Sequence, residues 1–241
     1  MATSFADFAE QTNPKALAEA RRAGFRQATR VHESFLAAAE KRALVWMAER
    51  MPVWVNSDHL TGLGFAAHIA TGVCYALAAY DRRMLLAAIV CLAVNWFGDS
   101  LDGTVARVRQ QQRPRYGFYV DHIIDSIGAV AMMGGLALSG YMHPVIAFGL
   151  LVAFLLLSIQ SYLATYALGE FHLSLWHFGP TELRVLLTAG NLALFRWAWV
   201  IHGRYRLFDI GGAIGLAGML LMLAVVTLKN TVRLYREERI R

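Results

Sequence analysis

The chain has 241 residues, of which 57% are hydrophobic and only 17% are charged, and its mean hydropathy is +0.42. This composition is too apolar for an ordinary soluble domain of this length. The net charge of +6 does not indicate nucleic acid, because the cations cluster beside apolar runs and form no basic face with stacking aromatics. We therefore expect an integral membrane protein whose cations contact membrane lipids, and no nucleic-acid partner.

Residues 1–51 form an N-terminal segment, and its first 40 residues lack an early apolar core and therefore do not have the pattern of a cleaved signal. Asn13-Pro14 suits the start of a helix. Apolar residues then recur at helical spacing opposite basic ones; they are Phe25, Ala28, Val31, Phe35 and Ala39. We predict an N-terminal amphipathic juxtamembrane helix, which either lies in the membrane interface or packs on the rest of the protein.

From residue 52 onward the chain contains repeated apolar runs, and a helix needs about 20 such residues to cross the hydrocarbon layer. The runs do not alternate as barrel strands do, so helices are expected. The predicted spans are Leu60–Tyr80, Met84–Leu101, Phe118–Tyr141, Pro144–Leu168, Glu182–Val200 and Ile210–Leu228. The predicted fold is an all-α integral membrane protein in which residues 52–241 form one domain of six transmembrane helices.

Lysine and arginine are unequally distributed between the two ends of these spans. Most of them lie on the side of the N-terminus, including those between the second and third spans. The positive-inside rule then predicts that both termini and this connection face the cytoplasm. We expect the membrane to be a bacterial inner membrane.

Four aspartates stand at the end of the second predicted span and the start of the third. Asp99 and Asp102 are three residues apart, and Asp121 and Asp125 are four apart, so each pair lies on one helix face. Because the connection between these helices is short, we expect them to be antiparallel neighbours whose ends bring the four carboxylates together. An aspartate at the centre of a membrane helix costs about 2.5–3.5 kcal/mol, so a compensating cation is expected.

All-oxygen ligand sets suit Mg²⁺ and Mn²⁺, and pairs of such ions about 3.5–4 Å apart serve phosphate transfer. We therefore predict a site for two divalent cations. The alternative is an ion or proton-coupled membrane transporter that uses intramembrane carboxylates. Transporter sites, however, usually lie at the midplane and accompany an internal repeat, and no repeat is visible in this sequence.

Small residues and arginines stand among the aspartates. Gly103, Ala106 and Gly117 serve either close helix packing or space for a phosphorylated ligand. Arg107 is nearest to the carboxylate face and is the best candidate for binding a phosphate. The remaining arginines are interpreted as membrane anchors; they are Arg109, Arg113 and Arg115.

From Asp99 to Asp125 the sequence reads D-x2-D-G-x2-A-R-x9-G-x3-D-x3-D. This pattern resembles the signature of the CDP-alcohol phosphotransferase family, with no member missing. The resemblance implies that the four aspartates bind two divalent cations, Mg²⁺ or Mn²⁺, and that Asp125 also acts as general base. It further implies that the CDP site is lined by Gly103, Ala106, Arg107 and Gly117.

Members of this family attack the pyrophosphate of a CDP-linked donor with an alcohol hydroxyl and release CMP. The resemblance therefore implies a transferase of phospholipid biosynthesis whose partners are a CDP-alcohol or CDP-diacylglycerol donor and an alcohol or lipid acceptor. His122 directly follows Asp121, which looks more like the choline and ethanolamine phosphotransferase branch than the phosphatidylglycerophosphate branch. A homodimer is compatible with the sequence.

Polar residues also precede two of the predicted spans. Asn56, Ser57 and Asp58 stand in the order expected of a helix cap, with a contact to a headgroup or acceptor as the alternative. Glu182 and Arg184 stand at the start of the fifth predicted span. They either select the acceptor or close the end of the helix.

Overall fold

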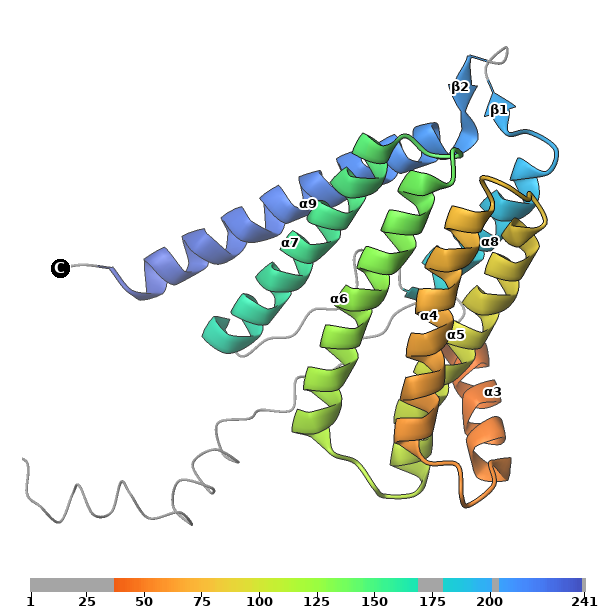
Figure 1. The fold of residues 1–241 in the computed structure, drawn as a ribbon. Helices are drawn as coiled ribbons and strands as arrows, with labels where there is room; N and C mark the ends of the chain where they lie inside the picture. The colour runs from red at the N-terminus through yellow and green to blue at the C-terminus, as the bar shows by residue number, and fades with distance from the viewer. Residues whose placement is uncertain (1–36, 169–179, 201–203, 240–241) are drawn as a thin grey trace, which may run out of the picture.

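The computed structural model describes residues 37–168, 180–200 and 204–239, and within them the chain is almost wholly helical (Figure 1). The helices are α3 (Ala37–Arg50), α4 (Ser57–Leu77), α5 (Met84–Val108), α6 (Pro114–Leu138), α7 (Pro144–Leu168), α8 (Pro180–Leu194) and α9 (Leu207–Glu237). Two short strands, β1 (Trp199–Val200) and β2 (Tyr205–Arg206), pair antiparallel between α8 and α9. The predicted amphipathic stretch from Phe25 to Ala39 lies outside the side chains that the structure describes.

Local sequence explains where the helices that carry the aspartates begin and end. Asn56 caps α4 in a capping box: its side chain accepts from the His59 N–H at 3.0 Å, and the His59 side chain accepts from the Asn56 N–H. After α5 ends, Gln110 adopts a left-handed φ of 56°, which turns the chain tightly. Pro114 then occupies the first position of α6, where its missing N–H costs nothing.

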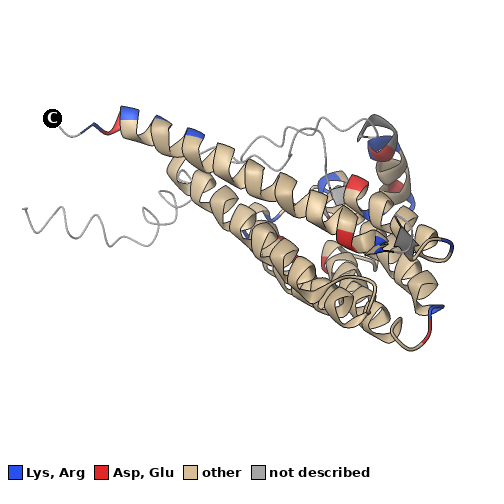
Figure 2. Ribbon diagram, turned by 90° about the horizontal axis from the view of Figure 1, so that it is seen from above, with Lys and Arg blue, Asp and Glu red and all other residues tan. Residues whose placement is uncertain are grey.

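Five of the described helices are long and apolar enough to cross a membrane: α4, α5, α6, α7 and α9. Figure 2 shows that these helices are mostly free of charged residues along their length. The prediction of an all-helical integral membrane protein is therefore confirmed in its general form.

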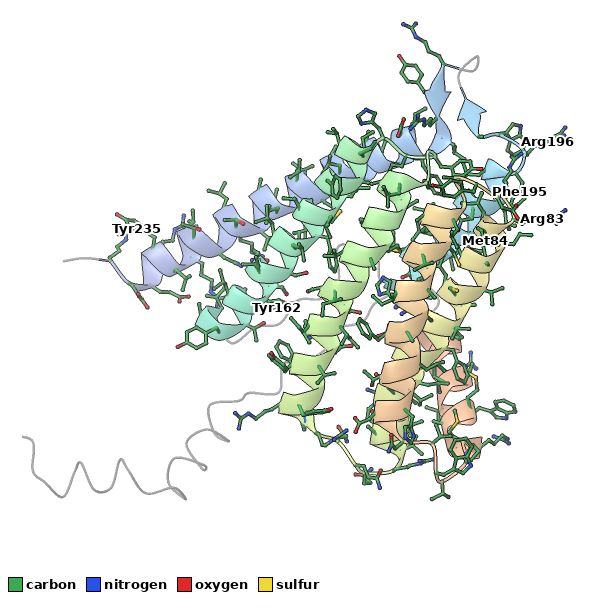
Figure 3. The ribbon with its side chains drawn as sticks, in the orientation of Figure 1. Arg83, Met84, Tyr162, Phe195, Arg196 and Tyr235 are labelled. Atoms are coloured by element: carbon green, nitrogen blue, oxygen red, sulfur yellow. The ribbon has the colours of Figure 1, made fainter. Side chains whose placement is uncertain are left out.

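The fifth predicted span, Glu182–Val200, differs from the structure. The described helix α8 has 15 residues and is therefore about 22 Å long. The hydrocarbon layer of a membrane is roughly 30 Å thick, so α8 is too short to cross it. It ends at Leu194, whose carbonyl accepts from Arg82 Nη2, and the Arg82 guanidinium lies 5.1 Å from the Phe195 ring centroid. Figure 3 shows this end of α8 beside the turn between α4 and α5. Six spans are thus not confirmed.

Helix α4 is the centre of the packing around the aspartates. A Cβ at Gly98 of α5 would lie 2.6 Å from the Gly64 nitrogen of α4, and one at Gly135 of α6 would lie 2.7 Å from the Gly72 carbonyl carbon of α4. The backbones of α5 and α6 therefore both approach α4 as closely as glycine permits. Direct contact between α5 and α6 is slight, so the expectation that they are packed neighbours was wrong: α4 joins them.

Two other helices support the same region. Leu44 and Ala48 of α3 are buried with Leu60, Leu101 and Val105 of α4 and α5. Helix α8 packs on α5, and its Arg184 donates to Asn95 and Asp99 of α5. The end of α5 that carries the aspartates is thereby enclosed by α3, α4 and α8.

Candidate active site

The four aspartates lie in regular helix, Asp99 and Asp102 on α5 and Asp121 and Asp125 on α6, and all four side chains are half-buried. We call them the carboxylate cluster. Asp125 interacts electrostatically with the other three, and Asp102 interacts with Asp99 and Asp121. The two predicted pairs therefore do face one region, and α4 contacts both of the helices that carry them.

Asp102 is held from two directions. The Thr61 hydroxyl of α4 donates to Asp102 Oδ2 at 2.6 Å, and the Gly103 N–H donates to Asp102 Oδ1. Hydrogen bonds to a charged acceptor are worth about 1.5–3 kcal/mol each. Thr61 is adjacent because α4 and α5 cross at Gly64 and Gly98, so the glycine contact directly positions this carboxylate.

Asp99 is paired with a cation from α8. Arg184 Nη2 donates to Asp99 Oδ2 at 2.7 Å, and Arg184 Nε donates to Asn95 Oδ1 at 2.8 Å. Asn95 in turn donates from Nδ2 to the Gly64 carbonyl at 2.9 Å. Arg184 thus joins the carboxylate cluster and does not merely close the end of its helix.

An aromatic group flanks the α6 pair. The ring centroids of Phe118 and His122 are 4.2 Å apart, and those of His122 and Tyr162 of α7 are 5.1 Å apart. His122 Nδ1 lies 2.6 Å from the Phe118 carbonyl and 3.7 Å from Asp121 Oδ2. Tyr162 lies on the lower half of α7 in Figure 3.

The motif's small residues and Arg107 lie at the exposed side of the site. Arg107 is exposed and its Nη2 donates to Thr104 Oγ1 at 2.9 Å, while a Cβ at Gly103 would lie 3.4 Å from Arg107 Nη1. Gly117 is exposed with open space around its Cα, and Ala106 is half-buried. The Arg107 side chain therefore lies over Gly103, the residue that directly follows Asp102.

Two of the arginines interpreted as anchors have specific protein partners. Arg109 donates to the carbonyls of the loop between α3 and α4; they belong to Met51 at 2.9 Å, Pro52 at 3.0 Å, Val53 at 3.4 Å and Val55 at 2.6 Å. Arg113 is paired with Asp58 and lies 4.3 Å from the Tyr116 ring centroid. Arg109 therefore fixes the loop that leads into α4.

The carboxylate cluster suits a divalent cation in its donor chemistry, because it offers only carboxylate oxygens and gathers negative charge that needs balancing. Thr61 and Arg184 already orient two of its members. As the side chains stand, no three His, Cys, Asp or Glu residues among those described are close enough together to hold one ion. Ion binding would therefore draw the α5 and α6 pairs toward each other.

Comparison with known families shows to which family the chain belongs. The model of the CDP-alcohol phosphatidyltransferase family matches residues 54–229, which is more than half of the chain. The chain belongs to the CDP-alcohol phosphatidyltransferase family. Among curated proteins, no matching relative was found.

Membership in the CDP-alcohol phosphatidyltransferase family makes the protein a transferase of substituted phosphate groups in phospholipid biosynthesis. The matched residues run from just before α4 into α9 and include the whole carboxylate cluster. The family uses CDP-alcohol donors and alcohol acceptors and generally depends on divalent metal. These findings support the transferase and give no support to the transporter alternative.

The structure adds site residues that the motif does not contain. Thr61 and Asn95 lie on the inner faces of α4 and α5, and Tyr162 of α7 contacts the His122 ring. A threonine, an asparagine or a tyrosine in an apolar helix is a common helix-bridging residue, so the sequence carries no signal that separates these from others. Only the crossing of the helices identifies them.

Proposed function

We propose that this protein transfers a substituted phosphate from a CDP-linked donor to an alcohol hydroxyl and releases CMP, using the carboxylate cluster as its reaction centre. The observation that carries the proposal is the convergence of two carboxylate pairs from α5 and α6 on one region within the family-matched segment. In the reaction, the acceptor oxygen forms a bond to phosphorus as the bond between phosphorus and the CMP oxygen breaks.

Asp99, Asp102, Asp121 and Asp125 are the residues that would hold two divalent cations, Mg²⁺ or Mn²⁺. Such ions, when bound, polarise phosphoryl oxygens and balance the charge that develops on the leaving group. The protein's contribution is to hold the ligands in place. Thr61 restrains Asp102, so less freedom of this side chain is lost when the site is filled. Arg184 orients Asp99.

Asp125 is the proposed general base. It is half-buried on α6, one turn after Asp121 on the same helix. A carboxylate within reach of the acceptor hydroxyl accepts its proton as the new oxygen–phosphorus bond forms. The proton leaves the acceptor and stays on the carboxylate until it is released to water.

The CDP moiety is proposed to lie along the exposed end of α5 and the start of α6, against Gly103, Ala106, Arg107 and Gly117. The open space at Gly117 leaves room for a ligand there. Arg107 is exposed on the same helix as Asp102, and a guanidinium binds phosphate oxygens in a forked geometry. This residue would therefore contact the donor's pyrophosphate.

We further propose a lipid acceptor of the kind used by choline and ethanolamine phosphotransferases. His122 packs between Phe118 and Tyr162, which makes an aromatic surface beside the α6 carboxylates that suits a lipid-borne hydroxyl. The proposed setting is a bacterial inner membrane, with the site and both termini cytoplasmic. Residues 1–51 are proposed as a separate juxtamembrane segment, residues 52–241 as the membrane domain, and a homodimer as the assembly.

A panel assay tests the proposal. Purified protein is incubated with Mg²⁺ or Mn²⁺, a set of CDP-linked donors and a set of acceptors, and CMP release is measured while mass spectrometry identifies the lipid product. We expect CMP release that requires both metal and acceptor. Absence of CMP release across the panel, from protein that is folded and binds metal, would contradict the proposed reaction.

A further inference from the structure

Arg184 is a charged residue outside the motif whose side chain reaches the carboxylate cluster. Its Nη2 donates to Asp99 Oδ2 at 2.7 Å, and the side chains of Arg184 and Asp99 are only 14% and 27% exposed. Water therefore screens this ion pair less than a surface pair. The guanidinium is a positive charge set at one edge of four negative charges.

Arg184 is also tied to the protein at a second point. Its Nε donates to Asn95 Oδ1 at 2.8 Å, and Asn95, 4% exposed, is itself oriented by donating to the Gly64 carbonyl at 2.9 Å. If Arg184 moved away, the Asn95 oxygen would be left without a donor in a buried position, which is unfavourable. The guanidinium is therefore anchored at Asp99 by the packing of α4, α5 and α8.

A divalent cation that uses Asp99 must share this carboxylate with Arg184. One of its oxygens already accepts from the guanidinium, and two cations on one carboxylate repel each other. We propose that Arg184 is a positioning residue that holds Asp99 in place and lowers the affinity of the carboxylate cluster for divalent cations by competing for Asp99. This inference rests on the proposed function, because it takes the cluster to be the cation site.

The consequence is that metal affinity is controlled from α8, a helix that lies outside the segment from Asp99 to Asp125. Loss of the Arg184 charge should make metal binding tighter, whereas loss of an ordinary supporting contact makes metal binding weaker, typically 10–100-fold. The direction of the change thus separates charge competition from a purely structural role.

Mn²⁺ binding to the full chain in lipid nanodiscs, measured by electron paramagnetic resonance without CDP donor, tests this inference. Arg184→Gln keeps a polar donor but removes the charge, and we expect its Mn²⁺ Kd to fall roughly tenfold or more. Arg184→Lys keeps the charge and should have a Kd close to the wild-type value. Arg113→Gln is the matched control, since Arg113 pairs with Asp58 outside the cluster, and its Kd should stay within about twofold of wild type.

Unchanged or weaker Mn²⁺ binding by Arg184→Gln would overturn the inference, and so would equally tightened binding by Arg184→Lys. If the glutamine variant does not fold, Arg184→Met, which keeps a long apolar stem, carries the same expectation and the same contrary outcome. Failure of the proposed function looks different: wild type and Asp102→Asn would then bind Mn²⁺ alike, whatever residue stands at position 184.

Discussion

Thr61 of α4 donates its hydroxyl hydrogen bond to Asp102 of α5 at 2.6 Å, so a residue outside the motif orients one of the proposed metal ligands. Such outer contacts matter because a carboxylate that is free to rotate must be ordered when the ion binds. The relationship depends on the crossing of α4 and α5 at Gly64 and Gly98. It connects the packing of the membrane helices to the chemistry of the site.

Thr61→Val removes this hydrogen bond while nearly preserving the shape of the side chain. We expect turnover to fall about 10–100-fold, as is usual when an outer-shell partner of a metal ligand is lost. Thr61→Ser keeps the hydroxyl and is the matched control, with turnover near wild type. CMP release at saturating donor measures both, and equal rates for the valine variant and wild type would show that Asp102 does not need Thr61.

Asp102→Asn should abolish transfer and leave the protein folded, because the amide is nearly isosteric but lacks the ligand's charge. CMP release and the Tm of the purified variant are the two measurements. Asp58→Asn is the control, since Asp58 pairs with Arg113 away from the carboxylate cluster, and its transfer rate should change little. A wild-type rate for Asp102→Asn would count against the metal role of this residue.

The helical class and the pairing of the aspartates were predictable because apolar length and i, i+3 or i, i+4 spacing are local properties of the chain. The position of α4 between α5 and α6 was not predictable from the sequence. The contacts of Gly64 with Gly98 and of Gly72 with Gly135 depend on how the helices cross. The end of α8 at Leu194 was missed for a similar reason. Arg82, which contacts its last carbonyl, is far away in sequence.

Gly98→Ala tests the close approach of α4 and α5. An added Cβ would lie 2.6 Å from backbone atoms of Gly64 and Leu60, and these cannot move aside as a flexible side chain can. We expect a loss of about 1–3 kcal/mol of stability, seen as a lower Tm, together with reduced turnover. Gly62→Ala is the matched control on α4, because nothing lies within 4 Å of its added Cβ; if both variants unfold alike, the tight crossing is not confirmed.

Arg107→Ala should weaken donor binding, because the proposed phosphate contact is lost in both the ground state and the transition state. The expected result is a higher donor KM with kcat little changed. Steady-state kinetics with the donor varied at saturating acceptor measure the two constants separately. If both stay at their wild-type values, Arg107 has no role in holding the donor and serves as a membrane anchor.

Asp125→Asn separates the two roles proposed for Asp125. If Asp125 is chiefly the base, the other three aspartates still hold metal and donor, and only proton removal from the acceptor fails. We then expect donor affinity and metal content near wild type and a single-turnover rate lower by roughly 10²–10⁴-fold. Equilibrium binding of the CDP donor, metal analysis and rapid-quench measurement of CMP on the same preparation give the three quantities.

The alternatives for Asp125 have distinct signatures in the same experiment. If Asp125→Asn loses both metal binding and donor binding, the main role of Asp125 is that of a metal ligand. Removing a base that does not bind metal would leave both kinds of binding intact. Full binding with a near-normal rate would remove it from the mechanism. The next candidate for the base would then be His122, which directly follows Asp121 in the chain. An imidazole can act as a general base, and His122→Gln would show the rate loss instead.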